Sequence, residues 1–149
     1  MRGWKLKTIK KFLPEFNQRP VTEDDLWRVF KQCGIIVRNV PLLVDGYCGF
    51  HHGRHYILLN DRLPPRRWLF TACHELSHYL FDVPKTEGEF LFRNSGADTA
   101  REKFADAFAC ICLLPFPELV RLAEDPPEED PDLLELCRSR LIVRNVYGI

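Results

Sequence analysis

The sequence contains no apolar run that could cross a membrane or serve as a secretory signal. Its 149 residues include no stretch that approaches the roughly 20 apolar residues needed to span a bilayer. The basic residues near the start are not followed by the apolar segment of a signal peptide. We therefore expect a cytoplasmic protein with no membrane contact.

The sequence also has no excess of charge of either sign. Lys plus Arg and Asp plus Glu each number 21, so the formal net charge is zero. This balance gives no electrostatic support for direct nucleic-acid or membrane binding. Hydrophobic residues make up 46% of the chain and aromatic residues 12%, so the chain can bury a core without covalent staples.

No CxxC pair occurs among the six cysteines, which are residues 33, 48, 73, 110, 112 and 137. Residues two apart on a helix, such as Cys110 and Cys112, point in different directions. This spacing predicts free thiols that act as small apolar residues, and it argues against a disulfide framework or a second metal site.

The most informative feature that is present is the segment His74-Glu-Leu-Ser-His78. On a helix the two histidines lie one turn apart on the same face, so both imidazole rings can bind one metal ion. Neutral imidazole is a good zinc ligand, and Glu75 could accept a proton from water that the metal has acidified. The pattern predicts a Zn2+ site with His74 and His78 as ligands and Glu75 as general base. The alternative is two hydrogen-bonded histidines on an amphipathic helix.

The surrounding residues favour that helix. Pro64 and Pro65 suit a helix start, and residues 66–81 contain no further Gly or Pro. A continuous apolar stripe runs through this segment at helical spacing, and the two histidines lie beside it. The stripe consists of Leu69, Ala72, Cys73, Leu76 and Leu80.

A catalytic zinc site needs a third protein ligand. The metzincin pattern would place glycine at position 81 and histidine at position 84, but the chain has Phe81 and Pro84, which excludes that class. The helical pattern over residues 99–114 offers Glu102 and Asp106, one turn apart and off its apolar stripe. Glu102 could be the third ligand, and Asp106 could accept the free ring N–H of a ligand histidine. The alternative is a solvated helix face.

Three segments between residues 56 and 115 share a pattern with one known family. They are Tyr56-Ile-Leu-Leu-Asn60, Arg67-Trp-Leu-Phe-Thr-Ala-Cys-His-Glu-Leu-Ser-His78, and Glu102-x-x-Ala-Asp-x-Phe-Ala109 running to Leu113-Leu-Pro115. Together they resemble the ImmA/IrrE family of zinc metallopeptidases, although Cys73 stands where alanine is usual and Asp106 where asparagine is common.

The resemblance implies a zinc-dependent endopeptidase whose substrate is a helix-turn-helix transcriptional repressor. The same family includes toxins of toxin–antitoxin pairs, in which case the partner would be an antitoxin. A third hypothesis is a non-catalytic module that only binds its partner. The intact Glu75 argues against this last hypothesis, because a structural metal site needs no general base.

The whole pattern predicts an α+β fold, with a small antiparallel or mixed sheet packed with the HExxH active-site helix and the second metal-binding helix. Thr22 and Asp25 resemble a capping box that opens an earlier helix, which Gly34 can end. The expected strands are 35–37, 47–51 and 54–60, the last two joined by a tight turn at His52-Gly53. All of these strands precede the metal-binding helices.

The last of these strands leads toward the metal-binding helix. We expect its edge to pair with an extended peptide substrate through Tyr56, Ile57, Leu58 and Leu59. Such pairing requires a flexible substrate segment. The alternative is an interior strand that is paired on both sides.

Three regions are expected along the chain. Residues 1–123 form the zinc metallopeptidase domain, residues 124–131 an acidic, Pro-rich linker, and residues 132–149 a short C-terminal helical segment. Within the first region, residues 83–98 read as a long loop that either covers the substrate cleft or is held to the core by Phe90 and Phe92.

Overall fold

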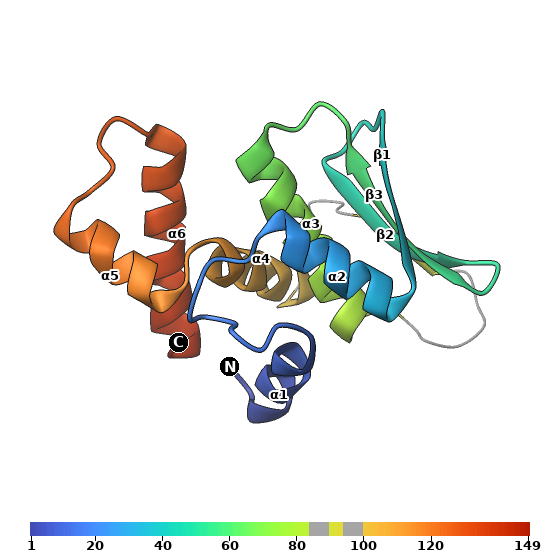
Figure 1. Ribbon diagram of the computed structural model, residues 1–149, viewed down its shortest axis with the longest axis horizontal. Coiled ribbons are helices and arrows are strands. Elements are labelled where there is room, and N and C mark those ends of the chain that lie inside the picture. The colour runs from blue at the N-terminus through green and yellow to red at the C-terminus, as the bar shows by residue number, and fades with distance from the viewer. Residues whose placement is uncertain (84–89, 94–99) are drawn as a thin grey trace. The chain divides into compact units, whose positions relative to one another are not determined.

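The computed structural model describes residues 1–83, 90–93 and 100–149, and these form six helices and one small sheet (Figure 1). The helices are α1 (Gly3–Phe12), α2 (Glu23–Cys33), α3 (Pro65–Phe81), α4 (Ala100–Leu113), α5 (Phe116–Glu124) and α6 (Pro131–Tyr147). The strands are β1 (Ile35–Val40), β2 (Gly46–His51), β3 (Arg54–Asn60) and β4 (Phe90–Arg93). The predicted α+β class is confirmed. No helix among the described residues has the length and apolarity required to cross a membrane.

The chain divides into two compact units. Thr22–Ala109, which we call the sheet unit, holds α2, all four strands, α3 and most of α4. Met1–Val21 and Cys110–Ile149 together form the helical unit, with α1, α5, α6 and the end of α4. The boundaries expected at residues 124–131 stay a prediction.

The sheet is mixed, with strand order β1-β3-β2-β4. β1 runs parallel to β3, whereas β2 runs antiparallel to both β3 and β4. The expectation that every strand precedes the metal-binding helices is wrong, because β4 lies between α3 and α4 in the sequence. β4 also interrupts the expected loop over 83–98, and the rest of that loop, from 84 to 89 and from 94 onward, lies outside the described residues.

The predicted turn and cap signals have the expected geometry. The Thr22 side chain accepts a hydrogen bond from the Asp25 backbone N–H, and the Asp25 side chain accepts one from the Thr22 N–H, so the capping box of α2 is confirmed. Gly34 ends α2 with φ 67°. His52 and Gly53 both have positive φ, as a two-residue hairpin turn between β2 and β3 requires.

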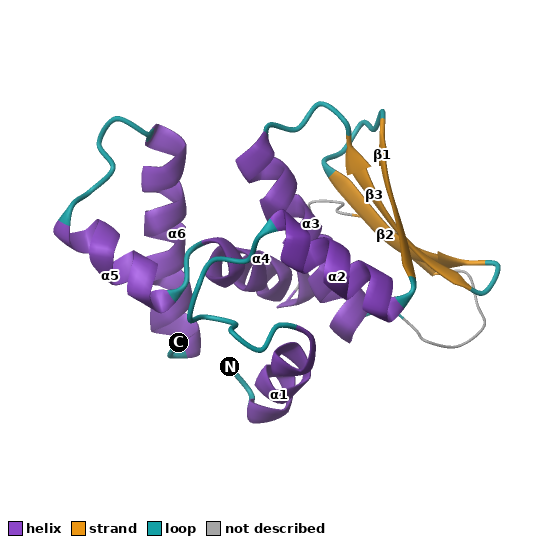
Figure 2. Ribbon diagram, viewed as in Figure 1, coloured by secondary structure: helices purple, strands orange, loops and turns teal. Residues whose placement is uncertain are grey.

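One face of the sheet carries the core of the sheet unit. α3 packs on β2 and β3, and α2 packs beside β1 (Figure 2). Alternate residues of the three strands are buried against these helices, as period-two side-chain geometry requires. They are Ile35, Val37, Cys48, Phe50, Ile57 and Leu59, and Ala72, Cys73 and Leu76 of α3 are buried as well.

The helical unit is held together by an apolar cluster and one buried arginine. Leu114, Leu119, Leu122 and Cys137 form the cluster, with Leu133 and Leu136 packed against it. Arg140 of α6 is completely buried and donates to the backbone oxygens of Leu114 and Ile149 and to the Asn17 side chain. None of the six cysteines forms a disulfide bond, as their spacing predicted.

Candidate metal centre and active site

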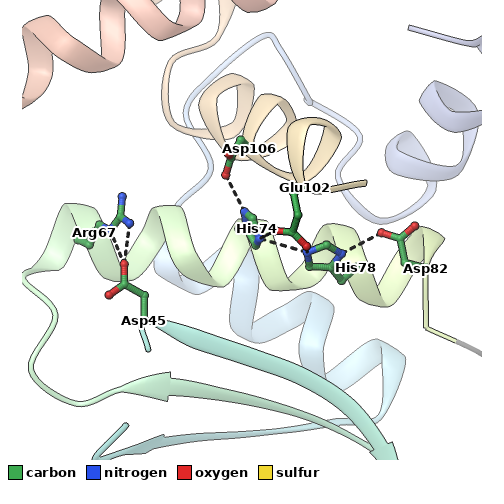
Figure 3. A network of polar contacts seen from close by, with 7 residues as sticks. All are labelled: Asp45, Arg67, His74, His78, Asp82, Glu102 and Asp106. Atoms are coloured by element: carbon green, nitrogen blue, oxygen red, sulfur yellow. Dashed lines mark hydrogen bonds and ion pairs between the residues drawn. The ribbon is translucent and has the colours of Figure 1, made fainter. Parts of the chain in front are cut away.

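α3 places both motif histidines in the interior of the sheet unit. Pro65 stands in its first turn, and residues 71–78 are buried without interruption. A helix that is buried all round must be covered on more than one side. The sheet covers one side of α3, and the two acidic side chains of α4 reach its histidines (Figure 3). His74 and His78 are only 3% and 1% exposed.

Three potential ligand atoms converge at this point. The Nε2 atoms of His74 and His78 lie 3.1 Å apart. The two carboxylate oxygens of Glu102 lie 3.2 Å from these nitrogens, one from each ring. A tetrahedral zinc ion with bonds of about 2.0–2.1 Å would hold its ligand atoms roughly 3.3 Å apart. The spacing of the three groups therefore fits a single zinc ion.

Each histidine ring is fixed from its other nitrogen by a carboxylate. His74 Nδ1 lies 2.8 Å from Asp106 Oδ1, and His78 Nδ1 lies 2.9 Å from Asp82 Oδ2 (Figure 3). Carboxylates accept hydrogen bonds, so in the neutral rings the proton is on Nδ1 and the Nε2 atoms keep their lone pairs. The Nε2 lone pairs of the two histidines and the Glu102 carboxylate thus face one another and repel. A cation bound between them would remove this repulsion. The residues present fit a zinc ion.

The charges around His74 also favour a cation. Burial of the His74 ring acts to lower its pKa, but the hydrogen bond to Asp106 and the nearby carboxylates outweigh burial and raise the pKa. The site therefore attracts positive charge, either as a proton on the ring or as a metal ion. Since a metal must displace the proton, zinc binding should weaken as the pH falls.

Glu75 lies beside the three ligands without being one of them. Its side chain is 1% exposed, and among the described residues its Oε1 atom has no hydrogen-bond partner. Burial raises the pKa of Glu75 to about 8, with Glu102 adding to the effect and His74 opposing it. A buried carboxyl next to a cation site is the arrangement expected of a general base or acid.

Asp82 was not identified from the sequence, although its position held a signal. It follows His78 by four residues, and side chains at this spacing can contact each other on a helix. Its carboxylate is 10% exposed, whereas that of Asp106 is 59% exposed. The structure brings together His74, His78, Glu102, Asp106 and Glu75, all of which the sequence had singled out.

The predicted substrate strand is not an edge. Residues Tyr56–Leu59 belong to β3, which pairs with β1 on one side and β2 on the other. Ile57, for example, lies opposite Val37 and Cys48 at once. Because both sides of β3 are already paired, the prediction that Tyr56, Ile57, Leu58 and Leu59 add a substrate strand is wrong.

Comparison with protein families agrees with this geometry. The sequence model of the family described as the IrrE N-terminal-like domain (Peptidase_M78) matches residues 34–135. The chain belongs to the ImmA/IrrE family. The match contains β1–β4, α3 and α4, and so includes every residue of the metal centre. Neither the curated proteins nor the solved structures gave a significant match. Family membership supports a metallopeptidase-like function.

Proposed function

We propose that this ImmA/IrrE-family chain is a zinc-dependent endopeptidase that hydrolyses a peptide bond in a protein substrate. The observation that carries the proposal is the cluster of His74, His78 and Glu102 with the buried carboxyl of Glu75 next to it. The Oε1 atom of this carboxyl has no hydrogen-bond partner among the described residues. Two His and one Glu with a neighbouring carboxylate is the ligand set of catalytic zinc in hydrolases, whereas structural zinc sites use four closed ligands, often cysteines. All six cysteines lie outside the cluster.

The roles of the residues follow from their positions. His74, His78 and Glu102 would hold the ion, and Asp106 and Asp82 would keep the two rings in the ligand orientation. When bound, zinc would acidify water and polarise the scissile carbonyl group. Glu75 would accept a proton from the attacking water on a carboxylate oxygen and pass it to the nitrogen of the leaving amine.

For the natural substrate we propose a helix-turn-helix transcriptional repressor, cut in a flexible segment. The support is the family resemblance of residues 56–115 and the family match. In a toxin–antitoxin pair the corresponding partner would be an antitoxin. A helix-turn-helix regulator encoded by an adjacent gene would favour the repressor, and its cleavage by the purified protein would establish it.

The test compares wild type with Glu75→Gln and with Glu129→Gln, an exposed control. Denatured, fluorescently labelled casein serves as a flexible protein substrate. We expect wild type and Glu129→Gln to cleave it and Glu75→Gln to hold about one zinc per chain while losing at least about 10²-fold in rate, since general base catalysis contributes that much. Equal cleavage by wild type and Glu75→Gln would exclude the proposed mechanism. If the wild type and Glu75→Gln both bound the repressor and neither cleaved it, the result would favour the non-catalytic module.

A further inference from the structure

Gly46, the first residue of β2, stands where any side chain would collide with the proposed general base on α3. A Cβ atom at this position would lie 2.8 Å from Glu75 Oε1 and 3.0 Å from Glu75 Cγ. It would also lie 2.6 Å from Thr71 Cγ2. Non-bonded carbon atoms are normally about 3.5–4.0 Å apart, so no side chain fits between β2 and this part of α3.

Space, and not backbone conformation, is the reason for glycine here. Gly34, Gly53 and Gly148 have positive φ, where other residues are strained, but Gly46 does not. Its distinctive property is that side chains of α3 occupy the space that a Cβ atom would need. A glycine within a strand often marks such a close approach.

The position of Gly46 is fixed from two sides. The preceding residue, Asp45, forms an ion pair with Arg67 in the first turns of α3, with distances of 2.8 and 2.6 Å to two guanidinium nitrogens (Figure 3). The backbone oxygen of Asp45 accepts a hydrogen bond from the Asn60 N–H at the end of β3. β2 therefore cannot move away from α3 without breaking one of these contacts.

One oxygen of the Glu75 carboxylate, the buried Oε1 atom, is not held by a hydrogen bond within the described part of the chain. This oxygen lies 2.8 Å from the point where a Cβ atom of residue 46 would stand, so the carboxylate occupies space that only glycine leaves open. We propose that Gly46 is a positioning residue that keeps the Glu75 carboxylate at the metal cluster. This inference rests on the proposed function, because it concerns the same general base.

The two neighbours of Gly46 should respond differently to an added methyl group. Thr71 is β-branched and stiff in a helix, so its contact would reduce folding stability. Glu75 is long and flexible, so its carboxylate would swing away at little cost to the fold. A displacement of about 1 Å at a reacting group can reduce the rate about 10²-fold.

This difference allows a test with three variants. Gly46→Ala places the methyl group against both neighbours. Gly46→Ala/Thr71→Ser removes the Thr71 methyl, leaves Glu75 as the main obstacle, and keeps the test valid if the single variant does not fold. Gly49→Ala is the matched control on the same strand, because its added methyl would meet the Tyr47 ring and not the metal cluster.

We expect Gly46→Ala and the double variant to hold about one zinc per chain. On labelled casein their kcat should fall about 10- to 100-fold while KM changes less than twofold. The Thr71→Ser change should recover thermal stability without recovering kcat, and Gly49→Ala should keep the wild-type kcat. Full recovery of kcat in the double variant would overturn the proposal, since packing against Thr71 would then explain the loss.

A second measurement does not depend on activity. Crystal structures of the metal-free wild type and the metal-free double variant should be compared. The Glu75 carboxylate of the double variant should be displaced by about 1 Å or more from its wild-type position. An unmoved carboxylate would overturn the positioning role. If the wild type fails to cleave casein, that result counts against the proposed function. The crystal structures then decide separately whether Gly46 positions Glu75.

Discussion

Asp82, the C-cap residue of α3, places its Oδ2 atom 2.9 Å from Nδ1 of His78, four residues earlier in the chain. Asp106 has the equivalent contact with His74, but it comes from a different helix and is far more exposed. A carboxylate that is shielded from water interacts more strongly with its partner than one that is solvated. Asp82 should therefore contribute more to ligand orientation than Asp106.

The first prediction is that Asp82→Ala weakens zinc affinity by about 10- to 100-fold, and that Asp106→Ala weakens it less. Asp24→Ala, at an exposed position on α2, is the control and should bind zinc like wild type. Competition with a chromophoric chelator measures the three affinities. Equal affinity of Asp82→Ala and wild type would show that His78 needs no orienting carboxylate.

A second prediction concerns the third ligand. Wild type should bind about one zinc per chain, and Glu102→Ala should release most of it, because two histidines alone do not make a stable site. Elemental analysis after gel filtration checks the stoichiometry. If Glu102→Ala kept its zinc, Asp106 or Asp98 would be the next candidate, although Asp98 lies outside the described residues.

The metal centre could be predicted from sequence because its signals are local. His74 and His78 lie within one turn of one helix, and Glu102 and Asp106 within one turn of another, so helical periodicity alone places each pair. The prediction that the two helices share one site required only the known ligand composition of catalytic zinc sites. The structure places these four side chains in contact.

Features that depend on contacts between distant segments could not be predicted. β3 has an alternating pattern of buried and half-buried residues, which is the same for an edge strand and a central one. Its parallel partner β1 lies about 20 residues earlier, as in the pairing of Ile35 with His55. Gly46 likewise has no local signal, because its neighbour Glu75 comes from another element.

The third prediction uses the central position of β3. Ile57→Pro and Leu58→Pro should both fail to fold, since a proline removes a ladder hydrogen bond and is tolerated only at sheet edges. Ile57→Val keeps the backbone N–H and should cost only about 1 kcal/mol. Circular dichroism during urea unfolding distinguishes these outcomes. A proline variant that stayed folded and zinc-loaded would contradict the pairing on both sides.

The last prediction follows from the raised pKa of Glu75 in the metal-free protein. Its pKa rises on folding from the ordinary 4.5 to about 8 because the carboxyl is buried. Below pH 4.5 the group is protonated in both folded and unfolded chains, so it has no effect. As the pH rises toward 8, the unfolded chain loses this proton while the folded chain keeps it, so stability falls with pH. By pH 8 the loss is on the order of a few kcal/mol.

Glutamine does not titrate, so Glu75→Gln should remove this loss. In the presence of a chelator, the variant should be more stable than wild type near pH 8, and the difference should shrink as the pH falls to about 5. Urea unfolding across this range measures it, with the exposed Glu129→Gln expected to match wild type throughout. Bound zinc should reduce the difference, because a nearby cation favours the charged carboxylate. A difference that did not change with pH would mean that Glu75 is ionised in the folded, metal-free protein. In that case Glu75 would not lower the folding stability of the metal-free protein, and zinc binding would have no such loss to offset.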